Sequence, residues 1–126
     1  MDGRILDLFM KENDAWDDLI TRHSKEIPDL ENMIASIFDK KKHVAEDIIS
    51  SVNVLKSEIR EQGNHMISIR EALAQQQCYL ASEKRRDPFP VKTLMSQNAL
   101  RERIRTVEKK FLDLKCNYLN YVASAL

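Results

Sequence analysis

The chain has 126 residues, with 20 basic and 20 acidic side chains, so no net charge draws it toward nucleic acid or a membrane surface. Only 2 Gly and 3 Pro accompany 43% hydrophobic residues, which favours long helices over a sheet and excludes a disordered chain. This length fits a single domain, residues 1–126. No apolar run approaches the ~20 residues needed to span a bilayer.

The first predicted helix covers about residues 4–23 and carries its apolar residues mostly on one face. These are Ile5, Leu8, Phe9, Trp16, Leu19 and Ile20. The helix should end before Pro28, because a proline pushes the preceding residue out of helical geometry. Trp16 is expected in the core, with an interface anchor as the alternative.

The second predicted helix, about residues 29–86, shows the clearest pattern. Its ladder steps by three and four, with one extra step of four, as in the seam of a coiled coil. The members are Leu30, Ile34, Ile37, Lys41, Val44, Ile48, Val52, Leu55, Ile59, Gln62, Met66, Ile69, Leu73, Gln76 and Leu80. The polar members would fix the register of the helices, or else lie at the edge of the seam.

Gly63 decides between two folds. The ladder keeps its spacing through this residue, and a glycine inside a helix costs only about 1 kcal/mol relative to alanine. We therefore expect the helix to continue. If it breaks at Gly63 instead, the chain would close into a compact monomeric four-helix bundle.

The third predicted helix covers about residues 91–126. Its ladder is Leu100, Ile104, Val107, Phe111, Leu114, Tyr118, Tyr121 and Ala125. The preceding stretch "EKRRDPFPVKT" (83–93) is expected to form the corner between two helices rather than a nuclear address or a polyproline ligand. Its basic residues would complement the end of one helix, and Asp87 with Pro88 would begin the next.

Both shorter helices should fold back on the long one. The sequence thus predicts an all-α, elongated antiparallel hairpin or coiled-coil rod that completes a four-helix bundle by dimerisation, because a rod two helices thick leaves apolar surface exposed. A heterologous coiled-coil partner is the alternative to a homodimer. The predicted partner interface consists of Met33, Phe38, Ile49, Val52, Leu55, Ile59, Met66, Ile67, Tyr118 and Tyr121.

Charge is distributed unevenly along the chain. Residues 1–28 hold 4 basic and 7 acidic side chains, whereas residues 90–126 hold 7 basic and 3 acidic ones. Arg101, Arg105 and Lys109 follow one helix face and are a candidate polyanion contact. Acidic residues interleave with them and no aromatic platform accompanies them, so a solvated face, or pairing with an acidic partner such as the first helix, is favoured.

No catalytic or metal-binding constellation is visible. Two histidines have a carboxylate four residues away, but each pair supplies two ligands where zinc requires three or four. These pairs are His43 with Asp47 and Glu61 with His65. Cys78 and Cys116 have no CxxC partner, and there is no glycine-rich phosphate loop. We expect no enzyme activity, no metal and no cofactor.

These observations predict a structural or interaction subunit that forms a coiled-coil assembly in a larger intracellular complex. Cytoskeletal, spindle or centromere, and tethering complexes use such rigid modules. A basic-helix nucleic-acid binder is the alternative function. The first residues lack the basic start and apolar core of a signal peptide, which predicts the cytoplasm or the nucleus.

Overall fold

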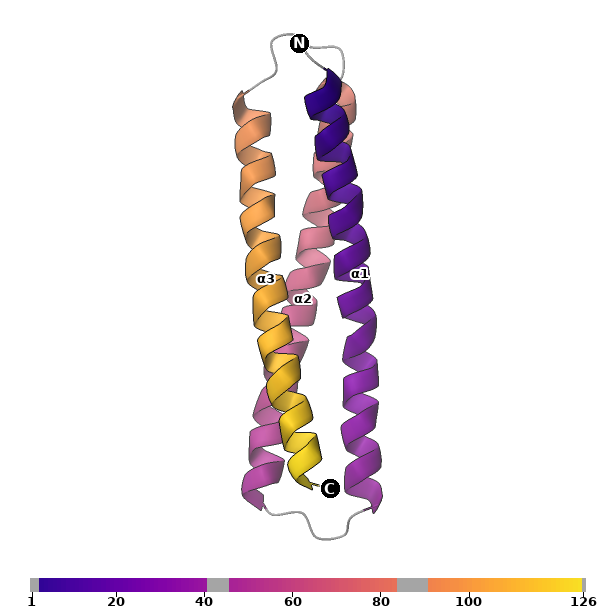
Figure 1. Cartoon of the computed structure of the whole chain (residues 1–126), viewed down its shortest axis with the longest axis vertical. Helices are drawn as coiled ribbons and strands as arrows, with labels where there is room; N and C mark the ends of the chain where they lie inside the picture. Colours follow the sequence, from indigo (N-terminus) through magenta and orange to yellow (C-terminus); the bar gives the residue numbers. More distant parts are fainter. Residues whose placement is uncertain (1–2, 41–45, 84–90, 126) are drawn as a thin grey trace.

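The computed structural model describes residues 3–40, 46–83 and 91–125, which form three helices. α1 spans Gly3–Lys40, α2 spans Glu46–Glu83 and α3 spans Val91–Ala125. The helices lie side by side, and α2 runs antiparallel to both α1 and α3 (Figure 1). No strand occurs in these three ranges, so the predicted all-α class is confirmed.

The predicted boundary at Pro28 is wrong. α1 continues through Pro28 to Lys40 and α2 begins at Glu46, whereas the sequence predicted one helix over about residues 29–86. Nε of Arg60 donates a hydrogen bond to Glu31 at 2.7 Å. In a single helix these two residues would lie about 44 Å apart. The long rod two helices thick is therefore replaced by a shorter, bundle-like arrangement of three helices.

α1 tolerates Pro28 because its core positions continue across the proline. The side chains that face the other helices step by three and four: Leu6, Phe9, Asn13, Trp16, Ile20, His23, Ile27 and Leu30. Pro28 is exposed, so its ring does not disturb the core. An interior proline costs about 3 kcal/mol. Burial of Ile20 and Leu30, at about 1.5–3 kcal/mol each, is large enough to offset that cost.

α2 has the seam that its sequence predicts. The buried residues are Val52, Leu55, Ile59, Gln62, Met66, Ile69, Leu73, Gln76 and Leu80. Lys41 and Val44 of the predicted ladder lie outside the described residues. The helix continues through Gly63, as expected, so the alternative fold with a break at this residue is excluded.

Gly63 lies where α1 comes close to α2. A Cβ atom at this position would stand 2.9 Å from Cδ1 of Ile27. Ile27, Pro28 and Gly63 line one hollow between the two helices. The two residues that could break a helix therefore face each other, and the missing side chain of Gly63 makes room for α1.

α3 begins at Val91, as predicted, and packs more extensively on α2 than on α1. Its buried residues are Thr93, Gln97, Leu100, Ile104, Val107, Phe111, Leu114, Tyr118 and Val122. Tyr121, predicted for the seam, is exposed, and Val122 is buried in its place. The predicted corner falls largely on residues 84–90, which lie outside the described part of the chain.

Candidate interaction surfaces

A layer of buried polar side chains joins all three helices near the start of α1. Nε2 of Gln97 on α3 donates to Oδ1 of Asn13 on α1 at 2.7 Å. Nε2 of Gln76 on α2 donates to Oε1 of Gln97 at 3.2 Å. A buried polar group without a partner costs about 1–3 kcal/mol, so this polar layer of Asn13, Gln76 and Gln97 disfavours any other alignment of the helices.

Gln77 extends the polar layer toward the surface between α1 and α2. Its Oε1 accepts a hydrogen bond from Nδ2 of Asn13 at 3.1 Å. Its Nε2 donates to the backbone oxygen of Met10 at 3.3 Å and to Oδ1 of Asp14 at 3.0 Å. Asn13 therefore has partners on both neighbouring helices.

The sequence predicted Gln76 as a seam residue but missed Asn13 and Gln97. Both are polar, and the ladders were traced through apolar residues. Their spacing carried the signal, because Gln97 stands three residues before Leu100 and Asn13 stands three residues before Trp16. Polar residues that continue such a spacing are candidates for register-fixing core positions.

Arg101, a candidate polyanion contact, binds α1 instead. Its Nε and Nη2 donate to the two carboxylate oxygens of Glu12 at 3.1 and 2.6 Å. Its guanidinium carbon lies 5.7 Å from the centroid of the Trp16 ring. Trp16 is half-buried and packs against the core, as predicted. Arg101 thus joins two helices through a bidentate ion pair and a cation–π contact.

The other two residues of the basic row lie on the surface. Nη1 of Arg105 donates to Glu102 on the same helix at 3.1 Å, and Lys109 is exposed. Because Glu12 holds Arg101, the row does not present three free cations on one surface.

Glu26 and Lys115 form a second ion pair between α1 and α3. It lies fourteen residues beyond Glu12 on α1 and fourteen residues beyond Arg101 on α3. The acidic first segment and the basic last segment of the sequence therefore meet within one chain. Partly exposed ion pairs contribute only about 1 kcal/mol or less, but their equal spacing matches one parallel register.

Tyr118 and Glu31 connect the second half of α1 to its neighbours. The buried Tyr118 hydroxyl donates to the backbone oxygen of Leu30 at 2.8 Å. Burial, followed by the nearby charge of Glu31, raises the pKa of Tyr118 to about 12. The hydrogen bond from Arg60 lowers the pKa of Glu31 and outweighs the opposing effect of burial.

His23 occupies a core position on α1 and packs its ring against Phe111, with 5.0 Å between the ring centroids. Its Nδ1 lies 3.7 Å from a carboxylate oxygen of Glu26. Neither ring nitrogen has a hydrogen-bond partner within the described part of the chain. No group of three or more metal-ligating side chains gathers in the described ranges. His23 therefore contributes a flat packing surface.

The predicted partner interface divides into buried and exposed residues. Its buried members belong to the core of this chain: Val52, Leu55, Ile59, Met66 and Tyr118. Their prediction as partner contacts is corrected, because the neighbouring helices of the same chain cover them. Met33, Ile67 and Tyr121 are exposed and Ile49 is half-buried. The side chain of Phe38 lies outside what the structure describes.

α1 and α3 stand in front of α2 in Figure 1, and eight of the eleven large apolar side chains exposed in the described ranges lie on these two helices. Six of these eight define what we call the α1/α3 face: Ile5, Leu8, Met33, Val91, Leu112 and Leu119. Ile5 and Met33 stand seven residues before Glu12 and seven residues after Glu26, and Val91 stands three heptads before Leu112, so each shares the side of its helix with that residue. Leu8 precedes Glu12 by four residues and therefore shares its side of α1. Leu112 and Leu119 flank Lys115 by three and four residues and share its side of α3.

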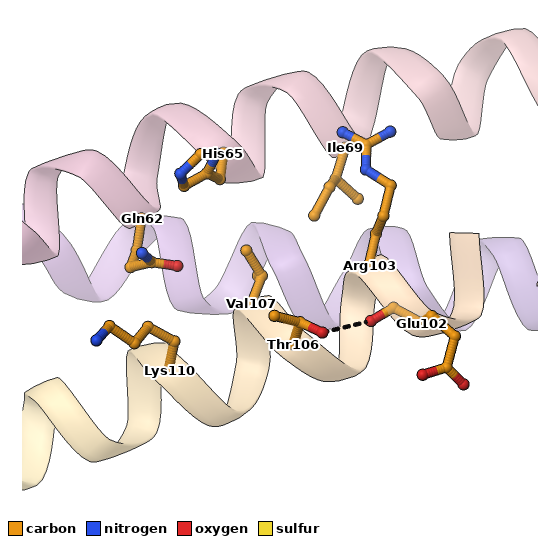
Figure 2. Close-up of a pocket in the computed structure, with 8 residues that line it drawn as sticks. All are labelled: Gln62, His65, Ile69, Glu102, Arg103, Thr106, Val107 and Lys110. Carbon is orange, nitrogen blue, oxygen red and sulfur yellow. Dashed lines mark hydrogen bonds between the residues drawn. The ribbon is translucent and has the colours of Figure 1, made fainter. Parts of the chain in front are cut away.

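A groove runs between α2 and α3 (Figure 2). Its larger hollow, about 510 Å³, is lined by Gln62, His65, Ile69, Glu102, Arg103, Thr106, Val107 and Lys110. Arg103 reaches across the groove, and its Nη2 donates to Oγ of Ser68 at 3.2 Å. Arg103 also borders a second hollow of about 310 Å³, which Leu100 and Tyr79 help to line.

Comparisons with protein-family models, curated proteins and solved structures find no match to this chain. Within the described ranges, none of the three helices has a stretch apolar enough to cross a membrane. Cys78 and Cys116 are both exposed and free. The described part of the chain is an all-helical, bundle-like protein, and its exposed surfaces are the candidate sites for binding a partner.

Proposed function

We propose that the protein is a structural interaction subunit that assembles with other helical chains in a larger intracellular complex. The α1/α3 face supports this most directly, because exposed apolar side chains gathered on one side of a protein often mark a protein-binding site. Cytoskeletal, spindle or centromere, and tethering complexes in the cytoplasm or nucleus need rigid modules of defined register. Such a role requires no catalytic centre, metal or cofactor, and we propose none.

The occupant that we propose for the α1/α3 face is a second copy of the chain. Ile5, Leu8 and Val91 lie toward one end of the face, and Met33 and Leu119 lie toward the other. A two-fold axis perpendicular to the helices would bring each apolar end onto the opposite end of the second copy. α1 and α3 of both copies would then form a four-helix bundle at the contact.

Nucleic-acid binding is the alternative function, and it has less support. The interaction with Glu12 occupies Arg101, and Arg105 is paired with Glu102. The exposed apolar residues of the α1/α3 face have no role in binding a phosphate backbone.

Glutamate at two positions of the face tests the proposal. We expect light scattering to give wild-type protein the mass of two 14.7 kDa chains. Leu8→Glu/Leu119→Glu should have the mass of one chain and unchanged helical circular dichroism, because both side chains are exposed. The control variant Val54→Glu/Ile67→Glu changes two residues that are each 58% exposed on α2, outside the face, and should keep the mass of two chains.

Two outcomes would contradict self-association through this face. One is a wild-type mass of a single chain at every concentration tested. The other is an unchanged mass of two chains in Leu8→Glu/Leu119→Glu, which would place the contact elsewhere.

A further inference from the structure

The α2/α3 groove has a different chemistry from the α1/α3 face. On the side of α3 that faces α1, the cations Arg101 and Lys115 are paired with carboxylates of α1. On the side that faces α2, Arg103 and Lys110 have no carboxylate partner among the described residues. The cations that α3 presents to the groove are therefore left uncompensated.

The acidic residue of the groove does not supply this compensation. Glu102 lines the larger hollow, but its Oε1 accepts a hydrogen bond from Arg105 at 3.1 Å. Figure 2 shows the Glu102 carboxylate pointing away from Arg103 and Lys110. His65 also lines this hollow and lies 3.8 Å from Glu61 on its own helix. The groove thus keeps a surplus of basic side chains.

The floor and walls of the groove suit a helix. Ile69 and Val107 are buried and give the larger hollow an apolar floor. Some lining residues have short side chains: Ala72, Ser96 and Ala99 in the smaller hollow and Thr106 in the larger one. Short side chains allow the backbone of an approaching helix to come close to α2 and α3.

We propose that the α2/α3 groove docks an acidic amphipathic helix of a partner protein. Two carboxylates of that helix, about seven residues apart, pair with Arg103 and Lys110, which are separated by about 10.5 Å along α3. Apolar side chains between these carboxylates enter the two hollows. The apolar floor favours a protein helix over a nucleic acid, whose stacked bases need aromatic platforms. This site deepens the proposed interaction role but uses a different surface from self-association.

A designed peptide provides the probe. It is a fluorescein-labelled, stapled alanine-based helix with Glu at positions i and i+7 and Leu at i+3 and i+4. A control peptide of identical composition carries both Glu residues on the opposite face. In fluorescence anisotropy with the full-length protein, we expect saturable binding of the first peptide that weakens with added salt. The control peptide should bind at least about tenfold more weakly.

Protein variants locate the binding site. Arg103→Glu/Lys110→Glu should weaken peptide binding at least about tenfold without changing helicity or oligomeric mass. The control variant Lys25→Glu/Lys109→Glu changes the net charge equally at two exposed positions outside the groove and should retain wild-type affinity. Light scattering on the same samples reports self-association, so failure at the groove is distinguishable from failure at the α1/α3 face.

Three results would overturn the proposal. The first is no binding of the acidic peptide to wild-type protein. The second is an equal loss of affinity in both variants, which would indicate unspecific attraction. The third is tighter binding of a short single-stranded DNA than of the peptide, with loss of that binding in Arg103→Glu/Lys110→Glu, which would assign the groove to nucleic acid.

Discussion

The three helices are held together by different contacts at two positions along the bundle: one level lies near the start of α1 and the other near its middle. Near the start, the polar layer of Asn13, Gln76 and Gln97 joins the helices by directional hydrogen bonds. In the middle, Ile20, Met66 and Phe111 are fully buried and join them by apolar packing. We call this second level the apolar middle.

The difference separates stability from register. Apolar packing is not directional, and aliphatic side chains at heptad spacing also fit a neighbour displaced by one heptad. A displaced helix would leave the buried amides of Asn13, Gln76 and Gln97 without partners, at about 1–3 kcal/mol for each group. The apolar middle therefore adds stability without selecting an alignment, and the polar layer selects one.

The largest expected effect concerns the apolar middle. Phe111→Ala should lower the free energy of unfolding by about 3–5 kcal/mol, because the fully buried ring leaves a cavity between α1, α2 and α3. Urea denaturation followed by circular dichroism measures this change. The exposed Met95 offers a control, since Met95→Ala should change stability by only about 0.5 kcal/mol or less. Equal losses of stability in both variants would contradict the placement of Phe111 in the core.

A smaller loss is expected in the polar layer. Gln97→Ala should cost about 1–3 kcal/mol, because Oδ1 of Asn13 and Nε2 of Gln76 each lose a hydrogen-bond partner. The same urea denaturation measures it. A cost as large as that of Phe111→Ala would show that the polar layer, not the apolar middle, dominates stability.

The stability of the fold should also depend on pH through Tyr118, which lies outside both the polar layer and the apolar middle. Its pKa in the folded chain is about 12, against an ordinary value of 10.0, so the fold favours the neutral hydroxyl. Its contribution is fully present below pH 10 and is lost as the pH rises through about 12. Tyr118→Phe should cost about 1 kcal/mol at neutral pH, the value of one hydrogen bond, and should show a smaller alkaline loss than wild type. Parallel alkaline curves for the two proteins would contradict this assignment.

The smallest change in stability is expected when the whole polar layer becomes apolar. Asn13→Leu/Gln76→Leu/Gln97→Leu removes all three amides together, so none of them is left without a partner and stability should be retained or increased. We expect the loss of a unique alignment instead, visible as mixed masses in light scattering and as broadened amide NMR signals. A single mass with sharp signals would show that the polar layer does not select the register.

The helices with regular aliphatic spacing were predicted from the sequence, whereas the continuation of α1 through Pro28 was missed. Val52–Leu80 of α2 and Leu100–Tyr118 of α3 carry mostly aliphatic core residues, and these ladders are confirmed. In α1, Asn13 and His23 are polar at core positions, and Pro28 imitates a helix end. The spacing continues across Pro28 as it does across Gly63, and the same argument applied to both would have predicted α1.

The surfaces were harder to predict because they depend on neighbours that are distant in the sequence. The partner of Arg101 is Glu12, 89 residues away, and no local pattern around Arg101 indicates this pairing. Met33, Ile67 and Tyr121 of the predicted interface are exposed, whereas Ile59 is covered once α1 lies beside α2 and α3. A ladder predicts which side of a helix is buried but not which helix covers it.

Small-angle X-ray scattering combined with light scattering on the full chain tests the central claim most directly. Each of the two longer helices has 38 residues, or about 57 Å, so two copies joined side by side should have a maximum dimension of about 70 Å. We expect that dimension together with the mass of two chains. A dimension above about 85 Å, the length of the extended rod, or the mass of a single chain would contradict the account.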